Sequence, residues 1–345
     1  MFRNFKPILK NFKFLKGFQQ NPYSQPWSKS TRLYATYRKF DNRNNATFTQ
    51  LLFDKTGRRY LMVTFGLGGL FYVTHLEKAP ISDRSRFIWV SPSLERRIGQ
   101  YSYKSILNET KGHIIPENHP LTRKVDKIFR RIVEAAIKEP GVDSNLLKDI
   151  QWKIHIVNDP RAPPNAFVLP NGKVFIFSSM LNICQNEDGI ATVLSHEFAH
   201  QLARHTAENL SKAPVYSLIG IIMYTITGVE GINRLLLDSF MRMPASRQME
   251  TEADYIGLMV MSRACFHPDE SVRLWERMSE YEKRTMQGAN FEFLSTHPAS
   301  TRRIENMRNW LPKARQLYEQ AECGMFGGFQ NSLYNTVDSF SSSIW

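Results

Sequence analysis

The chain has 345 residues, 42% of them hydrophobic, and a formal net charge of +13. This length allows one large or two modest domains with a sizeable core. Seven of the positive charges lie in residues 1–34, which contain no acidic residue, so the rest of the chain is only mildly basic. A nucleic-acid-binding protein concentrates its excess charge on its folded part, so this charge placement argues against nucleic acid as a partner.

The cysteines exclude two further classes of protein. Cys184, Cys265 and Cys323 are scattered, and no C-x-x-C occurs. This pattern argues against a disulfide scaffold and against a Cys-based zinc site. We expect three buried free thiols; a Cys265–Cys323 bridge in an oxidising compartment is the alternative.

The N-terminus has the composition of a targeting leader. Residues 1–40 contain no Asp or Glu, and their Lys and Arg residues alternate with Phe, Leu and Ile. Such a basic, acid-free stretch is typical of mitochondrial leaders, and it lacks the continuous apolar run of a secretory signal. Residues 32–35 resemble a matrix processing site, with cleavage after Tyr34. We predict a leader over residues 1–34, with a disordered basic arm as the alternative.

Two uncharged stretches are candidates for membrane-spanning helices. Residues 60–76 are long enough for a spanning helix at its lower bound, and a buried core helix is the alternative. The excess of Lys and Arg before this stretch places its N-terminal side in the matrix, so everything after residue 77 would face the intermembrane space. Residues 213–229 are also uncharged. A lone second crossing would separate two halves of the metal site described below, so we expect this segment to be buried or to dip into one leaflet.

The soluble part begins with a connector that we expect to be irregular because of its prolines. A helical stripe follows over residues 121–138, and residues 152–156 alternate as a strand. Asn171 and Gly172 separate two apolar runs within residues 165–177, which predicts a β-hairpin. An exposed edge strand at this place could pair with a substrate backbone, although a purely structural hairpin remains equally open.

The central motif is H-E-x-x-H at residues 196–200. On a helix, His196 and His200 stack one turn apart on one face, so both can reach a single metal ion, usually zinc. Glu197 lies beside the metal, where it can take a proton from bound water.

The context favours a metal-binding helix over two surface histidines. Apolar residues recur at every fourth position and predict a buried stripe, and acidic residues at 187 and 188 suit a helix start. We expect the histidines to lie largely opposite this stripe and to face a cleft. The stripe consists of Ile190, Leu194, Phe198 and Leu202.

The third metal ligand has several candidates. His205 would lie about 140° round a continuing helix from His200, and residues 201–204 contain no Gly that could turn the chain. Glu250 and Asp254 share a helix face, whereas Glu252 points about 200° away from Glu250. We therefore predict Glu250 as the ligand and Asp254 as an acceptor for the far ring nitrogen of a ligand His. An acidic, solvated helix face is the alternative.

These motifs, in this order, resemble those of the gluzincin metallopeptidases that include the CAAX prenyl protease and the bacterial heat-shock protease HtpX. The resemblance covers residues 113–312 and includes T-H-P at 296–298, R-I at 303–304 and L-P-N-G at 169–172. It implies an α+β fold: a mainly helical zincin-type domain with a small antiparallel sheet beside the H-E-x-x-H helix, here with an N-terminal transmembrane helix. It also implies that His297 donates to the oxyanion, although a structural His is as probable, and that Asn165, Ala166 and Phe167 bind substrate.

The family resemblance further implies a function. The leader and the single predicted span favour a mitochondrial inner-membrane member over the multi-span prenyl proteases of the endoplasmic reticulum. Such a member would be an ATP-independent zinc endopeptidase that cleaves membrane proteins in stress-responsive quality control, and the sequence contains no G-x-x-x-x-G-K-[ST] nucleotide motif. The implied ligands and partners are one Zn²⁺ per chain, the lipid bilayer and a second copy of the chain, without a nucleotide. A catalytically inactive, membrane-tethered adaptor is the rival function, and the intact Glu197 argues against it.

The predicted organisation ends in a tail. Apolar residues recur at spacings of three or four between 326 and 344, and we expect this stripe to dock on the catalytic domain or on a second copy, with disorder as the alternative. The predicted segments are a leader (1–34), a basic linker (35–59), a transmembrane helix (60–76), a connector (77–112), the peptidase domain (113–312) and the tail (313–345).

Overall fold

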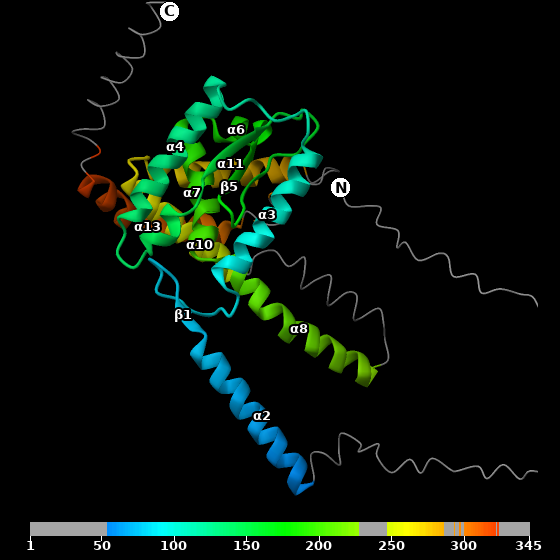
Figure 1. Ribbon diagram of the computed structural model, residues 1–345. Helices are drawn as coiled ribbons and strands as arrows, with labels where there is room; N and C mark the ends of the chain where they lie inside the picture. The colour runs from blue at the N-terminus through cyan, green and yellow to red at the C-terminus, as the bar shows by residue number, and fades with distance from the viewer. Residues whose placement is uncertain are drawn as a thin grey trace, which may run out of the picture. The chain divides into compact units, whose positions relative to one another are not determined.

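The computed structural model describes residues 54–227, 247–285, 293, 297, 300–321 and 323 (Figure 1). The predicted leader and the apolar stripe of the tail lie outside these residues. In chain order the elements are α2 (Lys55–Thr74), β1 (Leu76–Lys78), β2 (Ser85–Phe87), α3 (Pro92–Glu109), α4 (Pro120–Ile137), α5 (Ser144–Lys148), β3 (Lys153–Val157), β4 (Ala166–Val168), β5 (Lys173–Phe177), α6 (Ser178–Cys184), α7 (Glu187–Leu202), α8 (His205–Thr227), α10 (Arg247–Arg263), α11 (Asp269–Thr285) and α13 (Thr301–Gln320).

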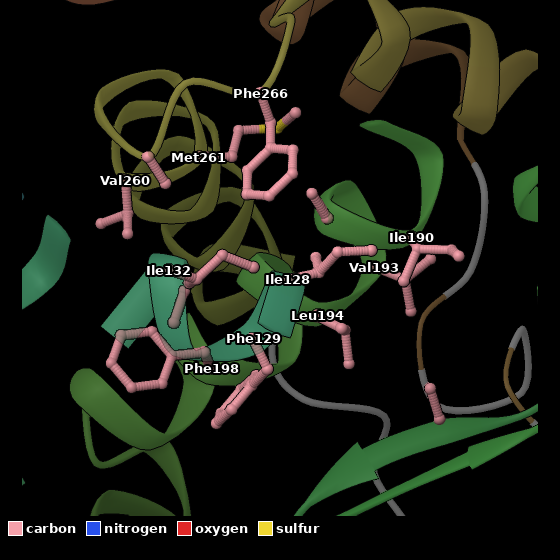
Figure 2. Close-up of a cluster of buried hydrophobic side chains, with 14 of the residues drawn as sticks. Ile128, Phe129, Ile132, Ile190, Val193, Leu194, Phe198, Val260, Met261 and Phe266 are labelled. Atoms are coloured by element: carbon pink, nitrogen blue, oxygen red, sulfur yellow. The ribbon is translucent and has the colours of Figure 1, made fainter. Parts of the chain in front are cut away.

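Helix α7, which carries the H-E-x-x-H motif, is the centre of the core. It begins at Asn186, whose side chain accepts a hydrogen bond from the backbone N–H of Gly189 at 2.8 Å, and acidic residues occupy its first turn. Helices α4, α10 and α11 and strand β4 pack against it. Figure 2 shows side chains of its predicted stripe packed with residues from α4 and α10. The stripe is confirmed, and α7 is buried on nearly every side: His196 is 2% exposed, and His200 is partly exposed. The cleft over the histidines stays a prediction.

A glycine sets the distance between α7 and α10. A Cβ atom at Gly257 would lie 3.0 Å from the backbone nitrogen of His196 and 3.0 Å from the carbonyl oxygen of Ser195. These distances are shorter than ordinary van der Waals contact, so the absent side chain allows the two helices to approach each other at the first histidine of the motif.

The small sheet is mixed, and the antiparallel sheet expected from the family resemblance is wrong in this respect. The predicted hairpin is confirmed: β4 pairs antiparallel with β5, and Gly172 in the turn has a φ of 80°. However, β3 pairs parallel with β5, which gives the strand order β3-β5-β4. Strand β3 joins the far strand of the hairpin, which no local pattern specifies, and β4 is left at an edge beside α7.

The connector is more regular than expected. Ser91 caps α3 through its side chain, and Pro92 occupies the first turn of this helix. Proline needs no hydrogen-bond partner there and has a suitable φ, so it begins a helix in this position instead of breaking one. Strands β1 and β2 form a second, two-stranded sheet. The expectation of an irregular connector is therefore wrong, whereas the helix expected over residues 121–138 is confirmed as α4.

Helix α2 contains the predicted transmembrane stretch up to Thr74. Among the helices of the described residues, none combines the length and apolarity required to cross a bilayer, so the predicted span is not confirmed. Residues 213–227 form part of α8, and there the exposed Pro214 and Leu218 do not fit the expectation that the segment is buried.

Cys265 and Cys323 form a disulfide, and Cys184 is a buried free thiol. The expectation of three free thiols is therefore wrong. The two bridged residues are 58 positions apart, and the packing of α13 against α10 and α11 brings their segments together. Helix α13 continues through the predicted domain boundary at residue 312 and buries Ala314.

Candidate metal centre

Four residues from three segments converge on one point. His196 and His200 come from α7, Glu250 from the first turn of α10, and His297 from the segment before α13, and their ligand atoms all lie within 4.8 Å of one another. The structure thus brings together the three predicted metal ligands and His297. The alternative that Glu250 lies on a solvated face fails, because Glu250 is buried.

The spacing of these atoms fits a tetrahedral zinc ion. The Nε2 atoms of His196 and His200 are 3.2 Å apart, and each lies 3.4 Å from a carboxylate oxygen of Glu250. Ligands held tetrahedrally at zinc distances of roughly 2.0–2.1 Å are separated from one another by about 3.3–3.4 Å. The donor set of two imidazoles and a carboxylate is also that of catalytic zinc sites.

The protonation of the histidines depends on their surroundings. Burial lowers the pKa of His200 well below its ordinary value, which keeps this imidazole neutral, as a metal ligand must be. Burial also acts to lower the pKa of His196, but the carboxylates of Asp254 and Glu250 outweigh it and raise the pKa to about 9. A metal that binds at His196 must therefore displace a proton. Burial would raise the pKa of Glu250, but the neighbouring His200, His196 and His297 hold it below its usual range.

Asp254 and Arg303 surround the first histidine. An oxygen of Asp254 lies 3.1 Å from Nδ1 of His196, but Nδ1 makes no hydrogen bond within the described residues, so the predicted acceptor role of Asp254 stays a prediction. Arg303 donates two hydrogen bonds of 2.7 Å to Asp254, and its Nη1 lies 3.0 Å from Glu250. Its guanidinium also stacks over the ring of Trp275 at 3.8 Å. Arg303 was part of a motif shared with the resembled family, but the sequence alone did not predict these contacts.

Glu197 has the environment of a proton acceptor. It is buried, and its Oε1 atom has no hydrogen-bond partner in the part of the chain that the structure describes. Burial raises the pKa of this carboxyl group. Across the site lies His297, whose Nε2 is 3.6 Å from Glu197 Oε1. His297 also approaches the Glu250 carboxylate at 3.0 Å through Nδ1, so its ring borders both carboxylates.

The predicted substrate-binding residues lie at the edge of the sheet. Ala166 and Phe167 begin β4, whose pairing within the described residues is with β5 alone. The carbonyl oxygen of Asn165 accepts a hydrogen bond from the backbone N–H of Phe177. This arrangement leaves one side of β4 without a strand partner in the described part of the chain, next to the helix that carries the motif.

His205 lies close to the metal centre, contrary to the helical geometry expected for it. Helix α7 ends at Leu202, and Arg204 then adopts a positive φ of 50°, which turns the chain before α8 begins. Nδ1 of His205 consequently lies 2.8 Å from Nδ1 of His200. Glu252, expected to point away from the metal, is buried and contacts Nε2 of His205 at 2.9 Å.

A buried helix that presents two imidazoles and a proton acceptor, with a carboxylate from a second helix at zinc-ligand spacing, defines a metallopeptidase of the H-E-x-x-H class. Comparison with known proteins agrees with this class, since residues 123–311 match Peptidase family M48. The chain belongs to peptidase family M48.

Similar proteins include two fungal enzymes and a human one. The chain is 58% identical to the mitochondrial metalloendopeptidase OMA1 of Saccharomyces cerevisiae, over 95% of this chain and 100% of that protein. It is 38% identical to the protein of the same name from Schizosaccharomyces pombe, over 100% of this chain and 92% of the relative. The human relative is 29% identical over 74% of this chain and 49% of its own length. The chain is therefore a mitochondrial zinc metalloprotease that acts on protein substrates.

Proposed function

We propose that this protein is an ATP-independent endopeptidase of the mitochondrial inner membrane that cleaves membrane proteins in stress-responsive quality control. The observation that carries its peptidase activity is the spacing of His196, His200 and Glu250, which matches the ligands of one tetrahedral zinc ion. Zinc, when bound there, supplies a Lewis acid that activates the attacking water and polarises the scissile carbonyl.

We assign proton transfer, stabilisation of the oxyanion and substrate binding to the residues around this site. Glu197 accepts the proton of the attacking water and returns it to the leaving amine, because its buried carboxyl group has a raised pKa and an oxygen without a hydrogen-bond partner among the described residues. His297 is our candidate donor to the oxyanion that develops on the scissile carbonyl, because its ring borders both Glu197 and Glu250. Strand β4, with Asn165 leading into it, has one side without a strand partner in the described part of the chain, and this side offers a place where the substrate backbone would add a strand to the sheet.

The proposed location rests on α2 and on the disulfide. Helix α2 carries large apolar side chains that are exposed on all of its faces, which suits a lipid environment, and we propose that it anchors the chain as a single span. A disulfide between Cys265 and Cys323 persists best in an oxidising compartment, which favours the intermembrane-space side for the catalytic domain.

The activity is tested by four variants and one control. His196→Ala, His200→Ala and Glu250→Ala should each lose zinc and proteolysis, whereas Glu197→Gln should keep zinc and lose about 10²–10⁴-fold in turnover. Glu187→Gln, on the same helix but exposed, is the matched control and should change neither. Zinc content and cleavage of a peptide library are measured on the purified full chain. Full zinc content in Glu250→Ala would reject this ligand assignment, and wild-type turnover in Glu197→Gln would leave the adaptor as the better function.

A further inference from the structure

A series of polar contacts leads away from the metal centre, starting at His200. His200 contacts His205, His205 contacts Glu252, and the Nε atom of Arg84 donates to Glu252 at 2.7 Å. His205 and Glu252 are 2% and 5% exposed, so water does not substitute for these contacts. None of the catalytic steps proposed above uses His205, Glu252 or Arg84.

The geometry fixes the hydrogen on each nitrogen of the two rings. Nε2 of His200 is the atom that faces Glu250 and His196, so its lone pair belongs to the metal and its hydrogen is on Nδ1. Within the described residues, the acceptor for that Nδ1–H is Nδ1 of His205, across 2.8 Å. His205 must then carry its own hydrogen on Nε2, which donates to the carboxylate of Glu252 across 2.9 Å. Every donor meets an acceptor in one arrangement only.

Glu252 is held in turn from a distant part of the sequence. Ser82 donates its hydroxyl hydrogen to Oε1 of Glu252, and Arg84 binds Oε2. The guanidinium of Arg84 also donates two hydrogen bonds, of 3.1 and 2.6 Å, to the carboxylate of Glu208 in α8. Lys212 donates to Glu208 as well, at 2.6 Å, so two acidic and two basic groups balance in this buried cluster.

We propose that His205 is a positioning residue for zinc: it fixes the tautomer and the ring orientation of His200 and is itself held by Glu252 and Arg84. Ligand histidines generally donate their second ring nitrogen to such a partner, and removal of the partner weakens metal binding by about 10–100-fold. An oxygen of Asp254 lies 3.1 Å from Nδ1 of His196, and the relay through His205 places a group beside the corresponding nitrogen of the second ligand histidine. Ser82 and Arg84 belong to the connector after α2, which makes the connector a structural part of the metal centre.

The inference rests on the proposed zinc site, and two substitutions at one position test it. Asn places its side-chain oxygen where Nδ1 of His stands, so His205→Asn keeps an acceptor for His200. Gln reaches the position of Nε2, so His205→Gln keeps the contact with Glu252 but loses that acceptor. We expect the zinc dissociation constant to rise about 10–100-fold in His205→Gln and His205→Ala, and less than about fivefold in His205→Asn.

The measurement is competition for zinc with a chelator of known affinity, on the full-length chain in detergent, with unfolding followed at saturating zinc. His155→Gln, at another buried histidine, whose ring packs against Tyr103 and Phe175, is the control and should bind zinc as the wild type does. Wild-type affinity in His205→Gln would overturn the proposal, as would equal losses in His205→Gln and His205→Asn. Arg84→Met should weaken zinc binding about 3–10-fold through Glu252, and an unchanged affinity would overturn the role of the connector. His200→Ala is measured in parallel to separate the two failures: zinc retention in that variant would refute the ligand assignment and the relay with it, whereas zinc loss there together with wild-type affinity in His205→Gln would refute the relay alone.

Discussion

Gly257→Ala is expected to weaken zinc binding although it touches no metal ligand side chain. The new Cβ would stand 3.0 Å from two backbone atoms of the α7 turn that carries His196 and 3.1 Å from the His196 Cα. Ordinary contact begins about 0.4 Å further out, and backbone atoms inside a buried helix cannot rotate away as a side chain can. Helices α7 and α10 must therefore separate by several tenths of an ångström.

The separation acts on both stability and the metal site. Ala is better than Gly in a helix by about 1 kcal/mol, whereas overpacking costs about 1–3 kcal/mol, so we expect a net destabilisation of up to about 2 kcal/mol. Zinc sites tolerate errors of about 0.2 Å in ligand position. A shift of Glu250 relative to the α7 histidines by more than this should cost about tenfold in zinc affinity, or about 1.4 kcal/mol.

Zinc affinity by chelator competition and unfolding by denaturant are measured on the same samples. Gly68→Ala is the matched control, because a Cβ at this helical glycine meets nothing within 4 Å. The reasoning would be refuted if Gly257→Ala bound zinc as tightly as the wild type and unfolded at the same or a higher denaturant concentration.

Two further predictions concern pH and topology. Burial lowers the pKa of His155 from 6.5 to about 4. Between these two pH values the unfolded chain binds a proton that the folded chain does not, so the free energy of unfolding falls as the pH falls. His155→Phe should remove this slope, at most about 1.4 kcal/mol per pH unit, in denaturant titrations at several pH values. An unchanged slope would contradict the assignment. In mitochondria whose outer membrane has been opened, added protease should digest the catalytic domain while matrix markers survive. Protection of the domain until the inner membrane is lysed would exclude the proposed orientation.

The parts of the site that follow a local period were predictable from the sequence. The spacing of His196 and His200, and that of Glu250 and Asp254, fixes a common helix face, and the structure retains both relations. The hairpin was equally local, because Asn-Gly selects a turn with positive φ. Each of these predictions needed only a few neighbouring residues.

The features that sequence reasoning missed depend on contacts between distant segments. The parallel partner of β5, the Cys265–Cys323 disulfide and the salt bridges of Arg303 and Arg84 each join residues whose separation no periodic pattern encodes. Charged residues such as these are usually solvated, so a charge in the sequence gives no indication that it will be buried and paired. Helix α3 is a different case, since its signal was present in Ser91 and Pro92 but was interpreted as a break.

The predicted position of His205 was wrong because a single residue, Arg204, has a conformation that a continuing helix does not allow. A positive φ at a non-glycine residue costs of order 1–3 kcal/mol and needs support from its surroundings, so Gly is the residue expected at such a turn. Arg204 adopts a φ of 50° and has that support in its own side chain, which donates to Glu95 at 3.0 Å and to the carbonyl oxygen of Val90 at 2.8 Å. Both partners lie in the segment around the start of α3, which the sequence did not place near the motif. The turn that brings His205 back to His200 is thus stabilised by the same stretch of chain, residues 82–95, that supplies Ser82 and Arg84 to Glu252. One segment therefore supports both the turn at Arg204 and the contacts that hold Glu252. A displacement of that segment would change the position of His205, and with it the contact to His200, through both.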